Sequence, residues 1–194
     1  KAKRNGIGIQ IAGYSKRRDW QGLRLPQIAK KEKKSVFDLV LEIERNGGAS
    51  IVNFNMSEED VRLIMRQKFV ATASDGSSRL PSDTVPHPRS YGCYPRKIGL
   101  YAIKEKVVTL EHAIRSASGL PADILSLPKR GYIKKGYFAD LVVLDPKRIR
   151  DVATFERPHQ YSEGVVHLFV NGVSVIEKGR YTGARPGKVL RHGK

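Results

Sequence analysis

The first helix indicated by the apolar pattern spans residues 35–46. Val36, Val40 and Ile43 recur at a helical spacing and fall on one face, so we expect them to be buried. Ser35 precedes the pattern, and two glycines follow it, which is the usual way for a helix to end.

Residues 50–74 predict a strand, a helix and a second strand. Residues 51–54 form a short β-prone run, and Ser57 can cap a helix with three acidic residues in its first turn. Residues 69–73 then form another apolar run, which we read as a buried strand. Strands connected through a helix almost always pair in parallel, so we expect a parallel pair here.

A loop rich in Ser, Pro and Gly is predicted over residues 75–99. Loops of this length usually carry function. Thr109 then resembles the cap of another helix, and Asn171-Gly172 between two apolar runs predicts a hairpin. Because the pattern changes from helical to short strands near residue 130, we expect an α/β part over residues 1–130 and an all-β part over residues 131–194.

The composition is that of a globular chain, with 40% hydrophobic and 28% charged residues, and no run reaches the roughly 18 apolar residues of a membrane span. We therefore expect no membrane partner. Cys93 is the single cysteine, so no internal disulfide can form and a reducing, cytoplasmic location is expected. The chain begins at Lys1, which leads us to expect further polypeptide upstream.

The net charge of +17 first suggests a nucleic-acid partner. Residues 1–34 hold eleven basic and two acidic side chains, and residues 180–194 hold five basic and no acidic ones. The charge therefore gathers at the two ends, with no basic stripe interleaved with aromatic residues. We expect no nucleic-acid partner and interpret the charge as a solvated basic surface, which can face an acidic polypeptide.

Asp75 is the first candidate for chemistry. It follows the predicted strand 69–73 and precedes a glycine, and catalytic groups of (β/α) barrels gather at the carboxyl ends of their strands. A carboxylate there can bind a metal ion or accept a proton from water. The alternative is that Asp75-Gly76 marks only a turn.

The predicted loop supplies His87 and Arg89. Two prolines flank His87, and an arginine held on such a loop can bind a substrate carboxylate through two parallel hydrogen bonds. The alternative is a hydrogen-bonded loop histidine and a surface charge. The five histidines are scattered and form no His-x-His pair, so the chain alone is not expected to hold a catalytic zinc ion. Cys93 lies in the same loop, where it could be a ligand or a nucleophile.

Three groups of segments together resemble the N-acyl-D-amino-acid deacylases of the amidohydrolase superfamily. Residues 131–145 (GYIKKGYFADLVVLD) are similar to the segment that opens the C-terminal β-sandwich strands of that superfamily. The last barrel strand and the following loop of the deacylases are similar to residues 73–76 (ASDG), 87–89 (HPR) and 92–96 (GCYPR). Three downstream segments resemble the same deacylases, namely residues 153–156 (ATFE), 158–161 (PHQY) and 182–190 (TGARPGKVL).

The resemblance, which runs from about Leu23 to Leu190, implies the last strands and helices of a metal-dependent (β/α)8 barrel, followed by a small β-sandwich. It implies a zinc-dependent hydrolase that cleaves the amide bond of N-acyl-D-amino acids. Asp75 would contact the metal and act as general base and then acid, and Arg89 would bind the substrate carboxylate. His87 stands beside it in the same motif, and Tyr14 is the nearest match to a substrate-binding tyrosine of the family.

Two departures from the family accompany this resemblance. Cys93 stands where a threonine or serine is expected. A complete barrel takes about 250 residues, so most zinc ligands are expected from an N-terminal part of the same enzyme or from a partner chain, and this chain alone is expected to be inactive. A hydrolase of cyclic amides or N-acyl dipeptides, and a non-catalytic basic remnant, are the alternatives.

Overall fold

The computed structural model describes residues 6–78 and 80–191 of the chain, and these fall into two compact units. Unit 1 combines Lys1–Glu58, Gly76–Tyr91 and Ala153–Gln160, and unit 2 combines Glu59–Asp75, Gly92–Val152 and Tyr161–Lys194. Each unit has its own hydrophobic cluster.

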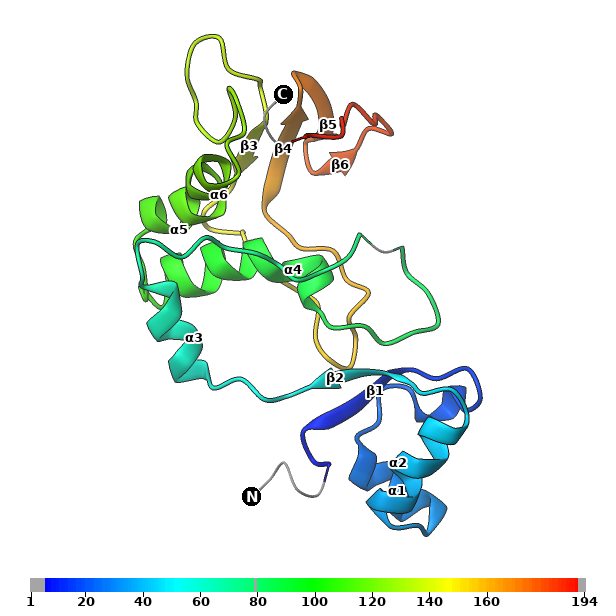
Figure 1. Ribbon diagram of the computed structural model, residues 1–194. Coiled ribbons are helices and arrows are strands. Elements are labelled where there is room, and N and C mark those ends of the chain that lie inside the picture. Colours follow the sequence, from blue (N-terminus) through cyan, green and yellow to red (C-terminus); the bar gives the residue numbers. More distant parts are fainter. Residues whose placement is uncertain (1–5, 79, 192–194) are drawn as a thin grey trace. The chain divides into compact units, whose positions relative to one another are not determined.

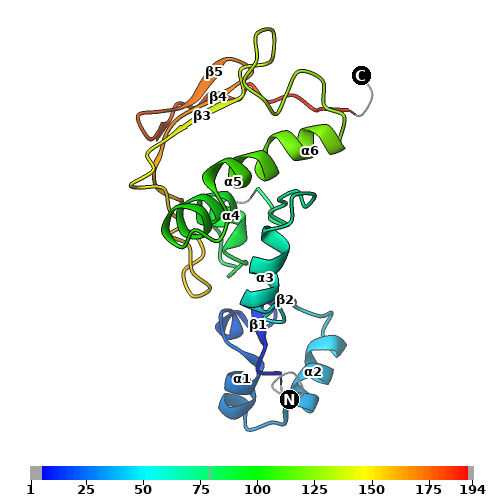
Figure 2. The ribbon, with the colours of Figure 1, turned by 90° about the vertical axis from the view of Figure 1, so that its left-hand side faces the viewer.

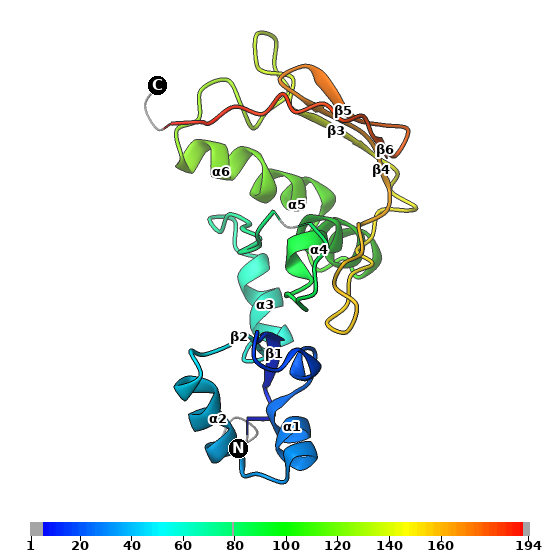
Figure 3. The same cartoon turned by 90° about the vertical axis from the view of Figure 1, so that its right-hand side faces the viewer.

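Unit 1 contains a two-stranded antiparallel sheet and two helices that lie on the same side of it (Figures 1 and 3). Ile11 of the first strand stands opposite Ile51 of the second. The elements of this unit are β1 (Ile9–Gly13), the 3-10 helix η2 (Arg18–Trp20), α1 (Leu25–Glu32), α2 (Val36–Arg45) and β2 (Ser50–Asn53).

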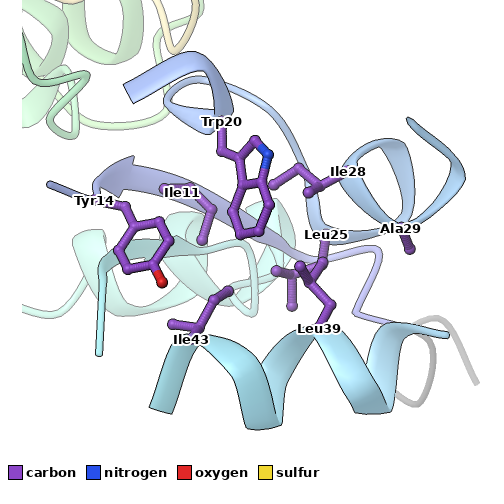
Figure 4. Packing of buried hydrophobic residues seen from close by; sticks show 8 residues of the cluster. All are labelled: Ile11, Tyr14, Trp20, Leu25, Ile28, Ala29, Leu39 and Ile43. Carbon is purple, nitrogen blue, oxygen red and sulfur yellow. The ribbon is translucent and has the colours of Figure 1, made fainter. Parts of the chain in front are cut away.

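The core of unit 1 forms around Trp20, whose side chain is fully buried (Figure 4). Its ring stacks on Tyr14 with the centroids 5.5 Å apart, and its Nε1–H donates to the Glu32 carboxylate at 3.1 Å. A buried indole therefore keeps a partner for its one polar atom. The cluster consists of Ile11, Tyr14, Trp20, Leu25, Ile28, Ala29, Leu39 and Ile43.

Unit 2 combines helices with a four-stranded antiparallel sheet of order β3-β4-β5-β6. Figure 2 shows α5 and α6 on one side of this sheet. Two helices, α3 and α4, begin in unit 1 and continue into unit 2. The elements are α3 (Glu58–Met65), α4 (Arg89–Arg96), the π-helix η3 (Lys97–Lys104), α5 (Leu110–Ala117), α6 (Gly119–Ile124), β3 (Leu141–Leu144), β4 (Val165–Val170), β5 (Val173–Glu177) and β6 (Arg180–Tyr181).

The predicted hairpin is confirmed between β4 and β5. Asn171 and Gly172 form its two-residue turn, and both have positive φ, at 50° and 80°. A two-residue turn of this kind matches the right-handed twist of the flanking strands, and Asn and Gly are the residues that adopt it most easily.

The cap predicted at Thr109 is confirmed, and Ser35 caps α2 in the same way. The cap expected at Ser57 stays a prediction. The Ser35 side chain accepts the Asp38 N–H at the start of α2, and the Thr109 side chain accepts the His112 N–H at the start of α5. The buried face of α2 differs from the prediction, because Leu39 is fully buried and Val40 is 40% exposed. Leu39 and Val40 are both about one turn from Val36, so spacing alone does not distinguish them.

The strand predicted over residues 69–73 is not formed, and β2 pairs antiparallel with β1 instead of in parallel with that segment. Phe69 is 77% exposed, and the Thr72 N–H donates to the Ser116 carbonyl at the end of α5. A strand needs a neighbour that continues its hydrogen bonds, and no described strand pairs with these residues.

The loop predicted over residues 75–99 ends earlier, because α4 begins at Arg89 and continues directly into η3. Gly92 and Pro95 both disfavour a helix, which is why the sequence indicated a loop. Tertiary contacts stabilise it: a Cβ on Gly92 would lie 2.7 Å from the Asp151 Cβ, and Arg96 forms an ion pair with Asp151. Within the described ranges, no helix is long and apolar enough to span a bilayer.

We predict that Leu39→Ala lowers the free energy of unfolding by about 3 kcal/mol, because it leaves a cavity beside Trp20. Phe37→Ala in the same helix is the matched control, since Phe37 is 71% exposed and its loss is expected to cost under about 0.5 kcal/mol. Urea unfolding followed by circular dichroism measures both, and equal effects would contradict the assignment of the buried face.

Candidate functional site

Asp75 ends the irregular segment that follows α3. Its backbone is left-handed, with φ at 46°, and its side chain is exposed. Aspartate tolerates this conformation better than most residues, but it still needs support from the surrounding structure. The segment that leads to Asp75 lacks a strand partner, so its position depends on other contacts.

Lys97 supplies one of these contacts. Its side chain is only 6% exposed, and its ammonium group donates to the Thr72 hydroxyl and, at 2.6 Å, to the Ser116 hydroxyl. Burial lowers the pKa of Lys97, because the charged form loses hydration. The buried ammonium therefore links Thr72, three residues before Asp75, to helix α5.

The segment after Asp75 is fixed by a close approach to α4 within unit 1. A Cβ on Gly76 would lie 3.0 Å from the Ser90 Cα, which is tighter than side chains normally accept, and the Ser77 N–H donates to the Ser90 hydroxyl at 3.2 Å. Gly76 follows Asp75 in the chain, and Ser90 follows Arg89. This contact therefore joins the covalent neighbours of two candidate residues.

Arg89 is the first residue of α4, and His87 lies two residues before the helix. The His87 Nδ1 accepts the Arg89 backbone N–H at 3.1 Å, as a capping side chain does for the unpaired donors at a helix start. The His87 ring also packs edge-on against Phe155, with the centroids 4.9 Å apart. His87 therefore fixes the backbone that carries Arg89, and its Nδ1 is engaged as an acceptor.

His159 is hydrogen-bonded at both ring nitrogens. Its Nε2 lies 2.7 Å from the Thr84 carbonyl oxygen, and its Nδ1 lies 2.9 Å from the Tyr91 hydroxyl. A carbonyl oxygen only accepts, so Nε2 carries a proton, and in the neutral ring Nδ1 accepts from Tyr91. Neither His159 nor Tyr91 is a candidate by sequence, although residues 158–161 are similar to a segment of the deacylases.

Tyr14 lies within the core of unit 1, where it is 4% exposed and stacks on Trp20. Asp75 is assigned to unit 2, whereas Tyr14, His87 and Arg89 belong to unit 1. A substrate contact by Tyr14 stays a prediction, as do the roles of the other three residues.

The described side chains do not gather into a metal site. Among the described residues, no group of three or more His, Cys, Asp or Glu side chains is placed to hold a metal ion. Cys93 is a half-buried thiol whose Sγ lies 3.9 Å from the Ala73 carbonyl oxygen. The described residues therefore do not form a complete zinc site by themselves.

The sequence model of the Amidohydrolase family matches residues 20–176. The chain belongs to this family. It is 39% identical over 169 residues to a D-aminoacylase from Alcaligenes xylosoxydans xylosoxydans, a match that covers 87% of this chain and 34% of the relative. It is 37% identical over 151 residues to an N-acyl-D-aspartate deacylase from the same organism, covering 78% of this chain and 30% of that protein.

Two solved structures of the amidohydrolase family resemble the chain closely. An N-acyl-D-glutamate deacylase from Bordetella bronchiseptica, in complex with zinc and a phosphonate inhibitor, gives a TM-score of 0.85 at 31% identity, covering 98% of this chain and 39% of that one. A crystal structure of D-aminoacylase gives a TM-score of 0.81 at 36% identity, covering 91% and 36%. The chain thus spans about a third of the length of the relatives it matches.

The buried Lys97 predicts a pH dependence of stability. Since its pKa is lowered in the folded chain, the unfolded chain binds more protons as the pH approaches the ordinary value of 10.5. Between the lowered pKa of Lys97 and pH 10.5, the free energy of unfolding therefore rises with pH, by at most about 1.4 kcal/mol per pH unit.

Lys97→Met should remove this contribution. Lys104→Met, at an exposed position of the same π-helix, should retain it. Urea midpoints measured from about pH 7 to pH 10 compare the two variants, in the interval where a lowered lysine pKa acts. Parallel pH profiles for both variants would show that Lys97 titrates as it does in the unfolded chain.

Proposed function

We propose that this chain is part of a metal-dependent hydrolase that cleaves the amide bond of N-acyl-D-amino acids. The observation that carries the proposal is a likeness in both sequence and structure over nearly the whole chain. Relatives named D-aminoacylase and N-acyl-D-glutamate deacylase match it over 87% and 98% of its length, respectively. The residues that the resemblance assigns to catalysis and carboxylate binding are present, at Asp75 and Arg89.

For the architecture, we propose that residues 1–130 supply the last strands and helices of a (β/α)8 barrel, with residues 75–99 as its active-site loop. Residues 131–194 would supply strands of a β-sandwich. The incompletely buried side chains along β4, together with Val142 and Val143 at 51% and 48% exposure on β3, support a sheet that packs against a further layer. That layer would come from the N-terminal part of the same enzyme or from a partner chain.

For the metal, we propose zinc, with most of its ligands supplied by polypeptide outside these 194 residues. A zinc-bound relative supports the choice of ion. The lack of a ligand cluster among the described residues supports the origin of the ligands. On this proposal the isolated chain has no hydrolase activity.

Asp75 would move the proton in the reaction. Its carboxylate takes a proton from the attacking water as the water oxygen bonds to the amide carbon. It then gives this proton to the amide nitrogen as the carbon–nitrogen bond breaks, which releases a carboxylate and the free D-amino acid. The supported but exposed position of Asp75 is compatible with this role, because the carboxylate is accessible to a substrate.

Arg89 would bind the substrate carboxylate. A guanidinium group can donate two parallel hydrogen bonds to a carboxylate, and this arrangement fixes orientation as well as charge. The first turn of α4, capped by His87, gives Arg89 a fixed backbone from which to act. For His87 we propose a supporting role in substrate binding through this cap. For Tyr14 we keep the substrate contact that the resemblance implies as a proposal.

We predict that Asp75→Asn in the full-length enzyme lowers kcat by about 1,000-fold and changes KM by less than about threefold. The amide keeps the size of the side chain and cannot accept the proton from water. Asp83→Asn, an exposed aspartate of the same loop that pairs with Arg18, is the matched control and should retain normal kcat. Near-normal turnover of Asp75→Asn would remove this residue from the mechanism.

We predict that Arg89→Ala raises KM for an N-acyl-D-amino acid by about 100-fold, equivalent to about 3 kcal/mol, through loss of a charge-assisted bidentate contact. Arg89→Lys keeps the charge without the bidentate geometry, so its KM should lie between those of the wild type and Arg89→Ala. The carboxamide analogue of the substrate is the control, since it presents no carboxylate. Equal losses for both substrates would favour a hydrolase of cyclic amides or another uncharged amide.

A further inference from the structure

A single imidazole, that of His159, contacts both ends of the stretch that carries His87 and Arg89. The stretch runs from Thr84 to Tyr91 and lies wholly within unit 1, as does His159. The Thr84 carbonyl is 2.7 Å from the His159 Nε2, and the Tyr91 hydroxyl is 2.9 Å from the Nδ1. His159 is remote from both in sequence, so these bonds exist only because of the fold.

The two bonds have a defined direction. Thr84 offers a carbonyl oxygen, so His159 donates through Nε2–H, and Tyr91 donates its hydroxyl proton to Nδ1 in the neutral ring. The Tyr91 ring also meets the His159 ring edge-on, at 89° between the planes and 5.6 Å between the centroids. Each partner can thus be removed separately, by deleting the Tyr91 hydroxyl or by changing the histidine.

The segment that supplies His159 is itself attached to the rest of unit 1. Its Phe155 carbonyl accepts from the Gln10 side chain of β1 at 3.1 Å, and the Phe155 ring packs on Phe54 with the centroids 4.5 Å apart. The same ring contacts His87 edge-on. Residues 153–160 therefore form a brace, which is anchored to β1 at one side and contacts the Arg89-bearing stretch at the other.

Residues 84–88 of the stretch lie ahead of α4 and belong to no helix or strand. The Val85 N–H donates to the Ala12 carbonyl of β1, and the Arg89 N–H donates to the His87 Nδ1. A loop with its two ends fixed has far fewer conformations than one held at a single end, so it loses less entropy when Arg89 must adopt one position. Fixing both ends from one rigid ring achieves this with two hydrogen bonds.

We propose that His159 and Tyr91 are positioning residues for Arg89, which hold its loop in the conformation that binds the substrate carboxylate. The proposal rests on the proposed function, because it assumes that Arg89 contacts that carboxylate. Neither His159 nor Tyr91 takes part in the proton transfer, so their effect falls on substrate binding.

The test uses the full-length enzyme with an N-acyl-D-amino acid and with its carboxamide analogue. Tyr91→Phe deletes one hydroxyl and opens the Tyr91 end of the brace. His159→Asn retains an acceptor near the Nδ1 position, cannot reach Thr84, and opens the other end. Tyr181→Phe and His167→Asn are the matched controls, since both residues lie in the four-stranded sheet of unit 2.

We expect Tyr91→Phe and His159→Asn each to raise KM for the carboxylate substrate about fivefold, with kcat within about twofold and the carboxamide kinetics unchanged. In an Arg89→Ala background, neither change should raise KM further, because residues that act through one group are not additive. The two controls should show wild-type kinetics.

Two contrary results are distinguishable. If Arg89→Ala alone leaves KM unchanged, the carboxylate-binding role in the proposed function fails, and the positioning role fails with it. If Arg89→Ala raises KM but Tyr91→Phe and His159→Asn raise it by the same factor with and without Arg89, or equally for the carboxamide, the positioning role alone is overturned.

Hydrogen exchange gives a second measurement that does not require activity. In Tyr91→Phe, which removes a single oxygen atom, backbone amides of residues 84–91 should exchange faster than in the wild type, whereas those of β4 and β5 should not change. Unchanged exchange over residues 84–91 would overturn the proposal, even if His159→Asn failed to fold.

Discussion

The segments that carry the candidate residues depend on one constraint, which is that their backbone is not part of a sheet. Buried polar groups of a backbone need partners wherever they lie. Here the backbone partners are a distant carbonyl group and a side chain: the Ser116 carbonyl for the Thr72 N–H, and His159 for the Thr84 carbonyl. The Thr72 side chain is held separately, because its hydroxyl accepts from Lys97. The geometry of the candidate site therefore rests on a few specific hydrogen bonds, each of which a single substitution can remove.

Local features of the fold could be predicted from sequence because their causes are local. Thr109 caps its helix through a bond that reaches only three residues along the chain, and Asn171-Gly172 adopts positive φ at the hairpin turn. The strand over residues 69–73 and the length of the loop after Asp75 depended on distant partners instead. Helix α4 forms despite Gly92 and Pro95, because it is stabilised by contacts to Asp151. These contacts could not be predicted from sequence, since Asp151 lies almost 60 residues further along the chain.

The candidate site likewise combines residues that could be proposed from sequence with contacts that could not. Asp75 and Arg89 could be proposed from short motifs and their likeness to a family, whose membership the comparisons show. The bonds of His159 to Thr84 and Tyr91 could not, because the partners are 75 and 68 residues apart in sequence. Lys97 gave no signal either, since a lysine ahead of an apolar run is expected to be solvated. Tyr14 was matched to a substrate-binding tyrosine of the family, and its burial in the core of unit 1 could not be predicted from that match.

The buried position of Trp20 has a consequence for spectroscopy. The chain has one tryptophan, and the indole is fully buried in unit 1 with its Nε1–H bonded to Glu32. Intrinsic fluorescence excited at the red edge of the absorption band therefore reports on unit 1 alone, with a blue-shifted emission while the cluster is intact. The emission maximum thus provides an optical probe of one half of the molecule without any label.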